Sequence, residues 1–119
     1  MERPSDSMSD GASRLEATCR DAGGPLFIPY VMGGFPDVAA SARYARVLAR
    51  HADIIELGVP FSDPLADGPT IQAAGQRALE AGTTPEDVLA IAASLRDGPP
   101  VVVMTYLNAV LAPGPRVFL

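Results

Sequence analysis

The stretch Asp53–Gln72, DIIELGVPFSDPLADGPTIQ, joins a short apolar run to a loop rich in proline and glycine and then to the start of a helix. The run Asp53–Val59 has the length and boundaries of a buried strand, although Glu56 lies at its centre. The loop that follows, Pro60–Pro69, is rich in turn-forming residues, and Thr70 then opens a helical pattern of apolar residues. A strand that leads through a loop into a helix is the repeating unit of parallel α/β folds.

Two other apolar runs are candidates for strands, Leu26–Met32 near the beginning of the chain and Val101–Tyr106 near its end. Pro29 has no amide hydrogen to donate to a neighbouring strand, so we expect the first strand at a sheet edge or at a bulge. No hairpin turn connects any two of the three runs, and longer segments with helical spacing separate them. The strands are therefore expected to run parallel in one sheet.

Helix signals fill the segments between the strands. Asp37 is a predicted N-cap of a helix that continues to about Arg50. A second helix is expected from Thr70 to the glycine at Gly82, and a third begins after Thr84, which is followed by a proline and an acidic residue at N3. The order strand, helix, strand, helix, helix, strand predicts an α/β fold.

The length of 119 residues allows one small domain, and no linker divides the chain. Residues 1–14 are mostly polar, and we expect a disordered lead there, with the ordered domain over residues 15–119. No apolar stretch approaches the roughly 18 residues that cross a membrane, and no apolar signal-peptide segment occurs near the N-terminus. The expected location is the cytoplasm, without membrane contact.

Composition excludes several kinds of chemistry within this chain. The 9 basic residues are all arginine, so a Schiff-base lysine, an anchor for pyridoxal phosphate and a P-loop lysine are all missing. His51 and Cys19 are the only residues of their kinds, and they cannot form a zinc cluster or a disulfide framework. The net charge of −5 argues against a nucleic-acid partner. Acid–base chemistry would therefore fall to carboxylates, tyrosines or backbone groups.

The carboxylates Glu56, Asp63 and Asp67 follow one another closely, at the place where a parallel sheet carries its functional groups. A charged glutamate inside an apolar strand costs several kcal/mol unless it is neutralised or paired. Glu56 is therefore either an acid–base catalyst or a structural residue paired with Arg43 or Arg77. Either aspartate alone is typical of a turn, but the three together favour a site in which Glu56 transfers a proton beside a second carboxylate.

The segment Asp53–Gln72 closely resembles the signature of the tryptophan synthase alpha chain family. Two shorter segments in the same order, Phe27–Pro36 and Met104–Asn108, are similar to the first strand and loop of that family and to its third strand. The resemblance implies a parallel (β/α)8 TIM barrel. A whole barrel takes about 250 residues, so this chain is expected to hold only about its first three βα units, as an N-terminal fragment or a truncated gene product.

The resemblance also implies a function. The family's alpha subunit is a lyase of L-tryptophan biosynthesis that cleaves indole-3-glycerol phosphate into indole and glyceraldehyde 3-phosphate by a retro-aldol reaction. Indole passes to a beta subunit in an α2β2 tetramer, and the cofactor pyridoxal phosphate belongs to that beta chain, so no cofactor and no metal are expected here. The alternative is a truncated, non-catalytic fragment that acts at most as an interaction module for the beta chain.

By motif, Glu56 matches the family's catalytic glutamate and Asp67 matches the aspartate that holds the indole N–H. The resemblance places Tyr30, Ile71 and Met104 against the substrate, and Tyr106 is a further candidate because it lies at a strand exit beside Asn108. Those that it places toward the beta chain are Asp63, Pro64 and Asn108. One departure is Phe35, which stands where many family members have an aspartate.

Overall fold

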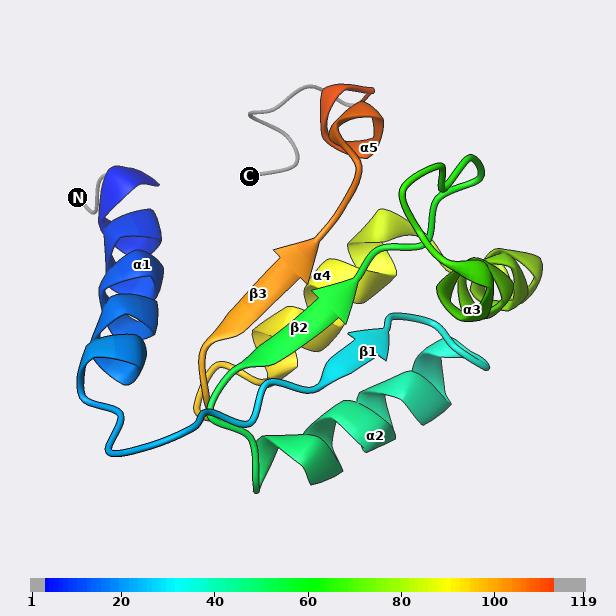
Figure 1. The fold of residues 1–119 in the computed structure, drawn as a ribbon. Helices are drawn as coiled ribbons and strands as arrows, with labels where there is room; N and C mark the ends of the chain where they lie inside the picture. The colour runs from blue at the N-terminus through cyan, green and yellow to red at the C-terminus, as the bar shows by residue number, and fades with distance from the viewer. Residues whose placement is uncertain (1–3, 113–119) are drawn as a thin grey trace.

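Three parallel strands form one sheet in the computed structural model of the chain, which describes residues 4–112. The strands are β1 (Tyr30–Met32), β2 (Ile55–Gly58) and β3 (Val101–Met104), and they lie side by side in sequence order (Figure 1). Both neighbouring pairs are parallel, which confirms the expected α/β class. Among the described residues, β2 is the central strand of this sheet.

Strand β1 begins directly after the proline that the sequence places inside the first apolar run. The Pro29 carbonyl accepts a hydrogen bond from the Glu56 amide at 2.9 Å. The proline therefore removes one hydrogen-bond donor from the strand but no acceptor. Among the described residues β1 is an outer strand of the sheet, which holds only three strands of the expected barrel.

Four helices follow the strands: α2 (Val38–Ala49), α3 (Pro69–Glu80), α4 (Pro85–Ser94) and α5 (Leu107–Leu111). The predicted caps of α2 and α4 are present: the side chain of Asp37 accepts from an amide of the first turn of α2, and Thr84 forms a capping box with Asp87. Gly82 has a φ of 85°, the left-handed conformation that ends α3. Helix α3 begins one residue earlier than predicted, because proline is well suited to the first helical position.

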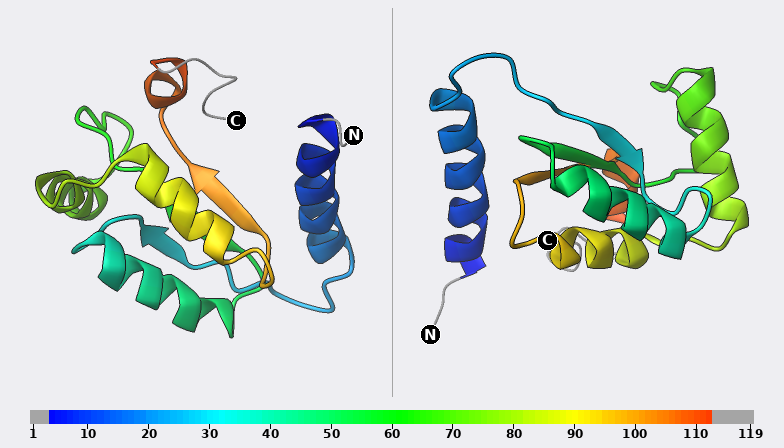
Figure 2. Two further views of the ribbon diagram at one scale, coloured as in Figure 1. Left: turned by 180° about the vertical axis from the view of Figure 1, so that it is seen from behind. Right: turned by 90° about the horizontal axis from the view of Figure 1, so that it is seen from below.

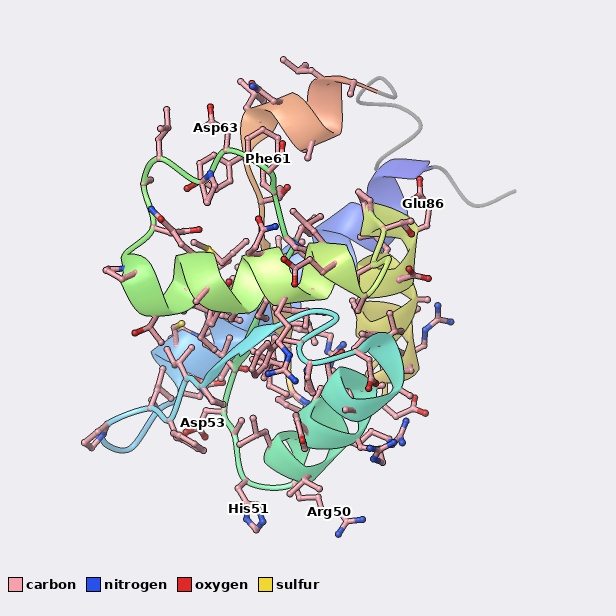
Figure 3. The ribbon with its side chains drawn as sticks, turned by 90° about the vertical axis from the view of Figure 1, so that its right-hand side faces the viewer. Arg50, His51, Asp53, Phe61, Asp63 and Glu86 are labelled. Atoms are coloured by element: carbon pink, nitrogen blue, oxygen red, sulfur yellow. The ribbon has the colours of Figure 1, made fainter. Side chains whose placement is uncertain are left out.

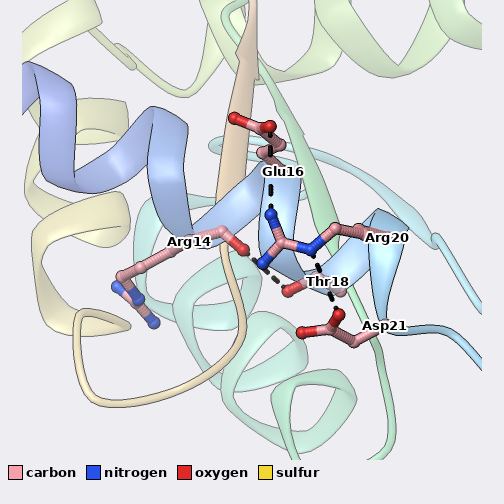
Figure 4. Close-up of polar contacts among 5 residues, drawn as sticks. All are labelled: Arg14, Glu16, Thr18, Arg20 and Asp21. Carbon is pink, nitrogen blue, oxygen red and sulfur yellow. Dashed lines mark hydrogen bonds and ion pairs between the residues drawn. The ribbon is translucent and has the colours of Figure 1, made fainter.

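A fifth helix, α1 (Pro4–Arg20), occupies most of the segment expected to be a disordered lead over residues 1–14. The guanidinium of Arg14 donates to the carbonyl oxygens of Gly98 at 2.6 Å and Arg96 at 3.4 Å, which ties this polar helix to the loop before β3. The last turns of α1 carry local contacts of Arg20 with Glu16 and Asp21 (Figure 4). The polar composition suggested disorder because the residue that anchors this helix lies more than eighty positions away in the chain. Local sequence gives no sign of such a contact.

The core lies between one face of the sheet and the helices α2 and α4, which lie on the same side of it (Figure 2). Side chains alternate along each strand, so Val31, Leu57 and Val103 share this face. Ile55 and Leu57 have no exposed surface, and Val88 of α4 is equally buried. The fold therefore depends on the odd-numbered residues of the central strand.

The opposite face of the sheet carries the side chains of alternate residues. In register order, Tyr30, Glu56 and Val102 share one row, and Met32, Gly58 and Met104 share the next. Met104 is 49% exposed, in contrast to Ile55 and Leu57 on the other face. The described helices leave this face largely open (Figure 2), and the carboxyl end of β2 leads into the loop before α3.

None of the helices in residues 4–112 is long and apolar enough to span a membrane.

Replacement of Leu57 tests the assignment of the core. We expect Leu57→Ala to lower the free energy of unfolding by about 2–5 kcal/mol, because it removes a fully buried side chain and leaves a cavity. The matched control is Leu65→Ala, since Leu65 is 84% exposed, and it should leave the stability nearly unchanged. Urea denaturation followed by circular dichroism measures both. Equal losses from the two variants would contradict the described packing.

Candidate active site

A cavity of about 380 Å3 opens at the carboxyl ends of the strands. It brings together both predicted catalytic residues and all four predicted substrate-contact residues: Glu56, Asp67, Tyr30, Ile71, Met104 and Tyr106. Three further lining residues, Val59, Ala66 and Thr105, were not predicted. Ala66 and Thr105 adjoin predicted residues in the sequence, whereas Val59 does not, and the small or aliphatic side chains of Ala66 and Val59 carry no chemical signal of their own.

Glu56 reaches the cavity from the centre of β2 and is half-buried. Neither of the arginines considered as its structural partners lines the cavity, and the guanidinium of Arg77 lies instead 5.8 Å from the centre of the Phe35 ring. Among the side chains of residues 10–112, the ion pairs are those of Arg20. In the described part of the chain, Glu56 is therefore a carboxylate directed toward a cavity rather than a member of an ion pair.

Asp67 enters the same cavity from the loop between β2 and α3 and is also half-buried. Its amide donates to the Pro64 carbonyl at 3.2 Å, and its own carbonyl accepts from the Gln72 side chain at 2.8 Å. Gln72 also donates to the Pro64 carbonyl at 3.2 Å, so one side chain of α3 holds two points of the loop. The Asp67 backbone is thus fixed from the side of α3.

Tyr30 places a phenol in the same cavity as the two carboxylates. Burial, followed by the nearby charges of Asp67 and Glu56, raises the pKa of Tyr30 to about 12. The phenol therefore stays protonated near neutral pH and can donate a hydrogen bond within the cavity. Its hydroxyl lies against Gly58, at the place where any larger residue would carry its Cβ atom.

Tyr106 forms the side of the cavity that belongs to the end of β3. Its ring is stacked on Phe61, with the two ring centres 5.0 Å apart and the planes inclined by 19°. Its hydroxyl oxygen accepts a hydrogen bond from the Ala66 amide at 3.0 Å. Tyr106 thus touches the loop between β2 and α3 at two points.

The three residues that the resemblance assigns to a partner surface lie outside this cavity. Asp63 is exposed, and Figure 3 shows it beside Phe61 at the end of the molecule where α5 lies. Asn108 lines a second hollow of about 550 Å3 together with Pro60 and Phe61. The loop that carries Asp63 and Pro64 thus shares with Asn108 the hollow lined by Pro60 and Phe61, and the contact of these residues with a beta chain stays a prediction.

The cavity combines two carboxylates and two phenols with aliphatic and aromatic walls. Such a set can transfer protons and can stabilise a positive charge that develops on a bound aromatic molecule. Residues 10–112 contain no group of three or more histidine, cysteine or acidic side chains placed to hold a metal ion.

Comparison with known proteins shows the family to which the chain is similar. Residues 17–119 match the model of the protein family described as "Tryptophan synthase alpha chain". A curated tryptophan synthase alpha chain from Deinococcus radiodurans is 43% identical over 98% of this chain and 45% of its own length. Another, from Carboxydothermus hydrogenoformans, is 52% identical over 84% of this chain and 39% of its own length. The chain thus spans less than half the length of these curated relatives.

Solved structures show the same similarity. Tryptophan synthase from M. tuberculosis in an open form superposes with a TM-score of 0.82 and 40% identity, over 91% of this chain and 44% of that one. The tryptophan synthase complex from Pyrococcus furiosus gives a TM-score of 0.73 and 40% identity, over 78% of this chain and 40% of that one. The three described strands therefore match part of the TIM barrel of these proteins, as the sequence resemblance implied.

The raised pKa of Tyr30 predicts a loss of stability in alkali. The folded pKa of about 12 exceeds the ordinary value of 10.0, so the contribution of Tyr30 to stability is fully present below pH 10 and decreases as the pH rises toward 12. We expect Tyr30→Phe to remove this part of the alkaline slope of the unfolding free energy. The control Tyr44→Phe, at a residue 51% exposed on α2, should retain it. Urea denaturation over that pH range measures the slopes, and identical slopes for both variants would refute the described environment of Tyr30.

Proposed function

Because this chain belongs to the tryptophan synthase alpha chain family, we propose that it is the first part of a lyase that cleaves indole-3-glycerol phosphate into indole and glyceraldehyde 3-phosphate. The observation that carries the proposal is the convergence of Glu56, Asp67 and Tyr30 on one cavity at the carboxyl ends of the strands. The proposal includes a role in L-tryptophan biosynthesis and a cytoplasmic location. It assigns no cofactor to this chain, since pyridoxal phosphate belongs to the beta chain in the family.

The proposed reaction needs a group that moves protons at the glyceryl side chain. Cleavage of the carbon–carbon bond requires a proton on the indole carbon that leaves and the removal of a proton from a glyceryl hydroxyl. Glu56 suits this role because its side chain lines the cavity from the central strand and forms no ion pair with the described arginines. A carboxyl group held in this way can accept one proton and return another.

Asp67 suits the complementary role. Protonation of the indole carbon breaks the aromaticity of the pyrrole ring and leaves a positive charge on the ring nitrogen. A carboxylate that accepts the N–H hydrogen bond stabilises this charge as it develops, and it does so best when its position is fixed beforehand. The hydrogen bonds from Gln72 and to Pro64 fix the backbone of Asp67 in this way.

The aliphatic and aromatic walls of the cavity suit the indole ring. Ile71 and Met104 line it from α3 and β3, and Tyr30 and Tyr106 add aromatic surface. An apolar pocket with few polar groups binds a flat heteroaromatic ring through burial and orients it through the polar groups. We assign these four residues to substrate binding.

We further propose that the surface around Asp63, Pro64 and Asn108 binds the beta chain, in an α2β2 tetramer. Asp63 is exposed beside the cavity loop, and Asn108 lines the adjacent hollow. The solved relative from Pyrococcus furiosus is itself a complex. A surface that adjoins the cavity mouth would let a small apolar product pass to a partner without entering the solvent.

Conservative substitutions test the catalytic assignment in the full-length product of the gene. We expect Glu56→Gln to lower kcat for indole formation by about 10²–10⁴-fold, because the amide cannot move a proton. Asp67→Asn should lower it by about 10²–10³-fold through the loss of the stabilising charge. Release of indole is measured spectrophotometrically.

Matched controls are Glu80→Gln and Asp97→Asn, which make the same chemical changes at exposed residues outside the cavity. Both controls should keep the original rate. Indole formation at the original rate in both Glu56→Gln and Asp67→Asn would overturn the proposed function.

The partner surface is tested by binding to the purified beta chain. We expect Asp63→Ala to weaken this binding about tenfold, the effect of an energetically important interface residue, while Asp97→Ala leaves it unchanged. Calorimetric titration measures the affinity. A gene product that binds and activates the beta chain but forms no indole would support the alternative function of an interaction module.

A further inference from the structure

Tyr106 connects the end of β3 to a residue 40 positions earlier in the chain, next to Asp67. We propose that Tyr106 is a positioning residue, which holds the loop Pro60–Gly68 so that the Asp67 carboxylate faces the cavity. The contact itself is independent of any reaction, whereas its effect on catalysis rests on the proposed function.

The loop needs such support because it makes few contacts with the rest of the fold. Leu65 is 84% exposed, and Ala66 is exposed as well. The loop's own backbone hydrogen bonds are local: Leu65 donates to the Asp63 carbonyl at 2.9 Å and Asp67 donates to the Pro64 carbonyl at 3.2 Å. Bonds of this kind shape a turn, but they do not fix the turn relative to the sheet.

Two side chains from outside the loop supply that connection among the described residues. Gln72 holds the Asp67 and Pro64 carbonyls from α3, and Tyr106 holds the Ala66 amide from the end of β3. The two contacts act on neighbouring peptide groups from different elements. Gln72 holds the peptide group that follows the Asp67 Cα atom, and Tyr106 holds the peptide group between Leu65 and Ala66, in the turn that leads into Asp67.

Tyr106 is well placed for this task. Its ring stacks on Phe61 near the start of the loop, while its hydroxyl accepts from Ala66 near the end. A single rigid side chain therefore contacts the loop at points five residues apart. The stacking also restrains the ring, which keeps the hydroxyl oxygen aimed at the amide.

The ring and the hydroxyl of Tyr106 have different roles in the cavity. Its ring lines the wall, as expected of a substrate contact, but its hydroxyl acts on the protein backbone. Removal of the hydroxyl should therefore affect the placement of Asp67 and leave the apolar wall in place.

Hydrogen exchange of the Ala66 amide tests the contact directly. In Tyr106→Phe we expect this amide to exchange about fivefold faster, since a net contribution near 1 kcal/mol corresponds to a change of about that size in an equilibrium. The control Tyr44→Phe makes the same change at an exposed tyrosine of α2 and should leave the rate unchanged. Unchanged exchange at Ala66 in Tyr106→Phe would overturn the proposal whether or not the chain is an enzyme.

A double-mutant cycle tests the catalytic consequence in the full-length product. We expect Tyr106→Phe to lower kcat for indole formation about fivefold with KM unchanged, and to have no further effect when Asp67→Asn is already present. A rise in KM at constant kcat would make Tyr106 a substrate contact only. An equal loss in both backgrounds would show that Tyr106 acts independently of Asp67, and either result would refute the positioning role.

Failure of this proposal can be told apart from failure of the proposed function. If Glu56→Gln and Asp67→Asn kept full activity, the proposed function would be wrong, and the exchange of the Ala66 amide would still decide whether Tyr106 holds the loop. If those two variants lost activity while Tyr106→Phe changed neither exchange nor kcat, only the positioning role would be wrong.

Discussion

Glu56 lies between Ile55 and Leu57, two residues with no exposed surface, and yet its own side chain is half-buried on the opposite face of the sheet. This alternation along β2 is the constraint on which the rest of the structure depends. A shift of one residue in the pairing of β2 would turn the glutamate into the core and expose both apolar neighbours. The energy that packs the core therefore also fixes the direction of the carboxylate, because the same strand register determines both.

The position of Asp67 has a different origin. The loop that carries it has no strand register to define it, and its place follows from side chains on both sides. Glu56 is thus positioned by the core and Asp67 by polar contacts at the surface. The two carboxylates of the cavity differ accordingly in how strongly the fold determines them.

Much of this arrangement could be predicted from the sequence, because the signals involved are local. The caps of α2 and α4 follow from residues close together in the sequence, Asp37 before α2 and Thr84 with Asp87 at α4. Glu56 could be selected because a charged residue inside an apolar strand is unusual. Asp67 is, like Asp63, typical of a turn by itself, and the resemblance distinguished the two and assigned Glu56 and Asp67 their roles. The cavity brings them together, and those roles remain a proposal.

The rest depends on contacts between distant residues, which a single sequence does not reveal. The helix α1 was expected to be disordered over most of its length, and its anchor is the contact of Arg14 with a loop near residue 98. The bond between Tyr106 and Ala66 joins two residues whose types give no sign of a pair. The placement of Arg77 over Phe35, rather than beside Glu56, likewise depends on the packed structure.

The close approach of the Tyr30 hydroxyl to Gly58 has an evolutionary consequence. The phenol occupies the space that a side chain at position 58 would need, so the two positions cannot vary independently. A larger residue at 58 requires a smaller or shifted residue at 30, and the shape of the cavity changes with either. Among members of the family, the residues at these two positions should therefore covary, and an alanine at 58 would be accompanied by a side chain at 30 that lacks the hydroxyl.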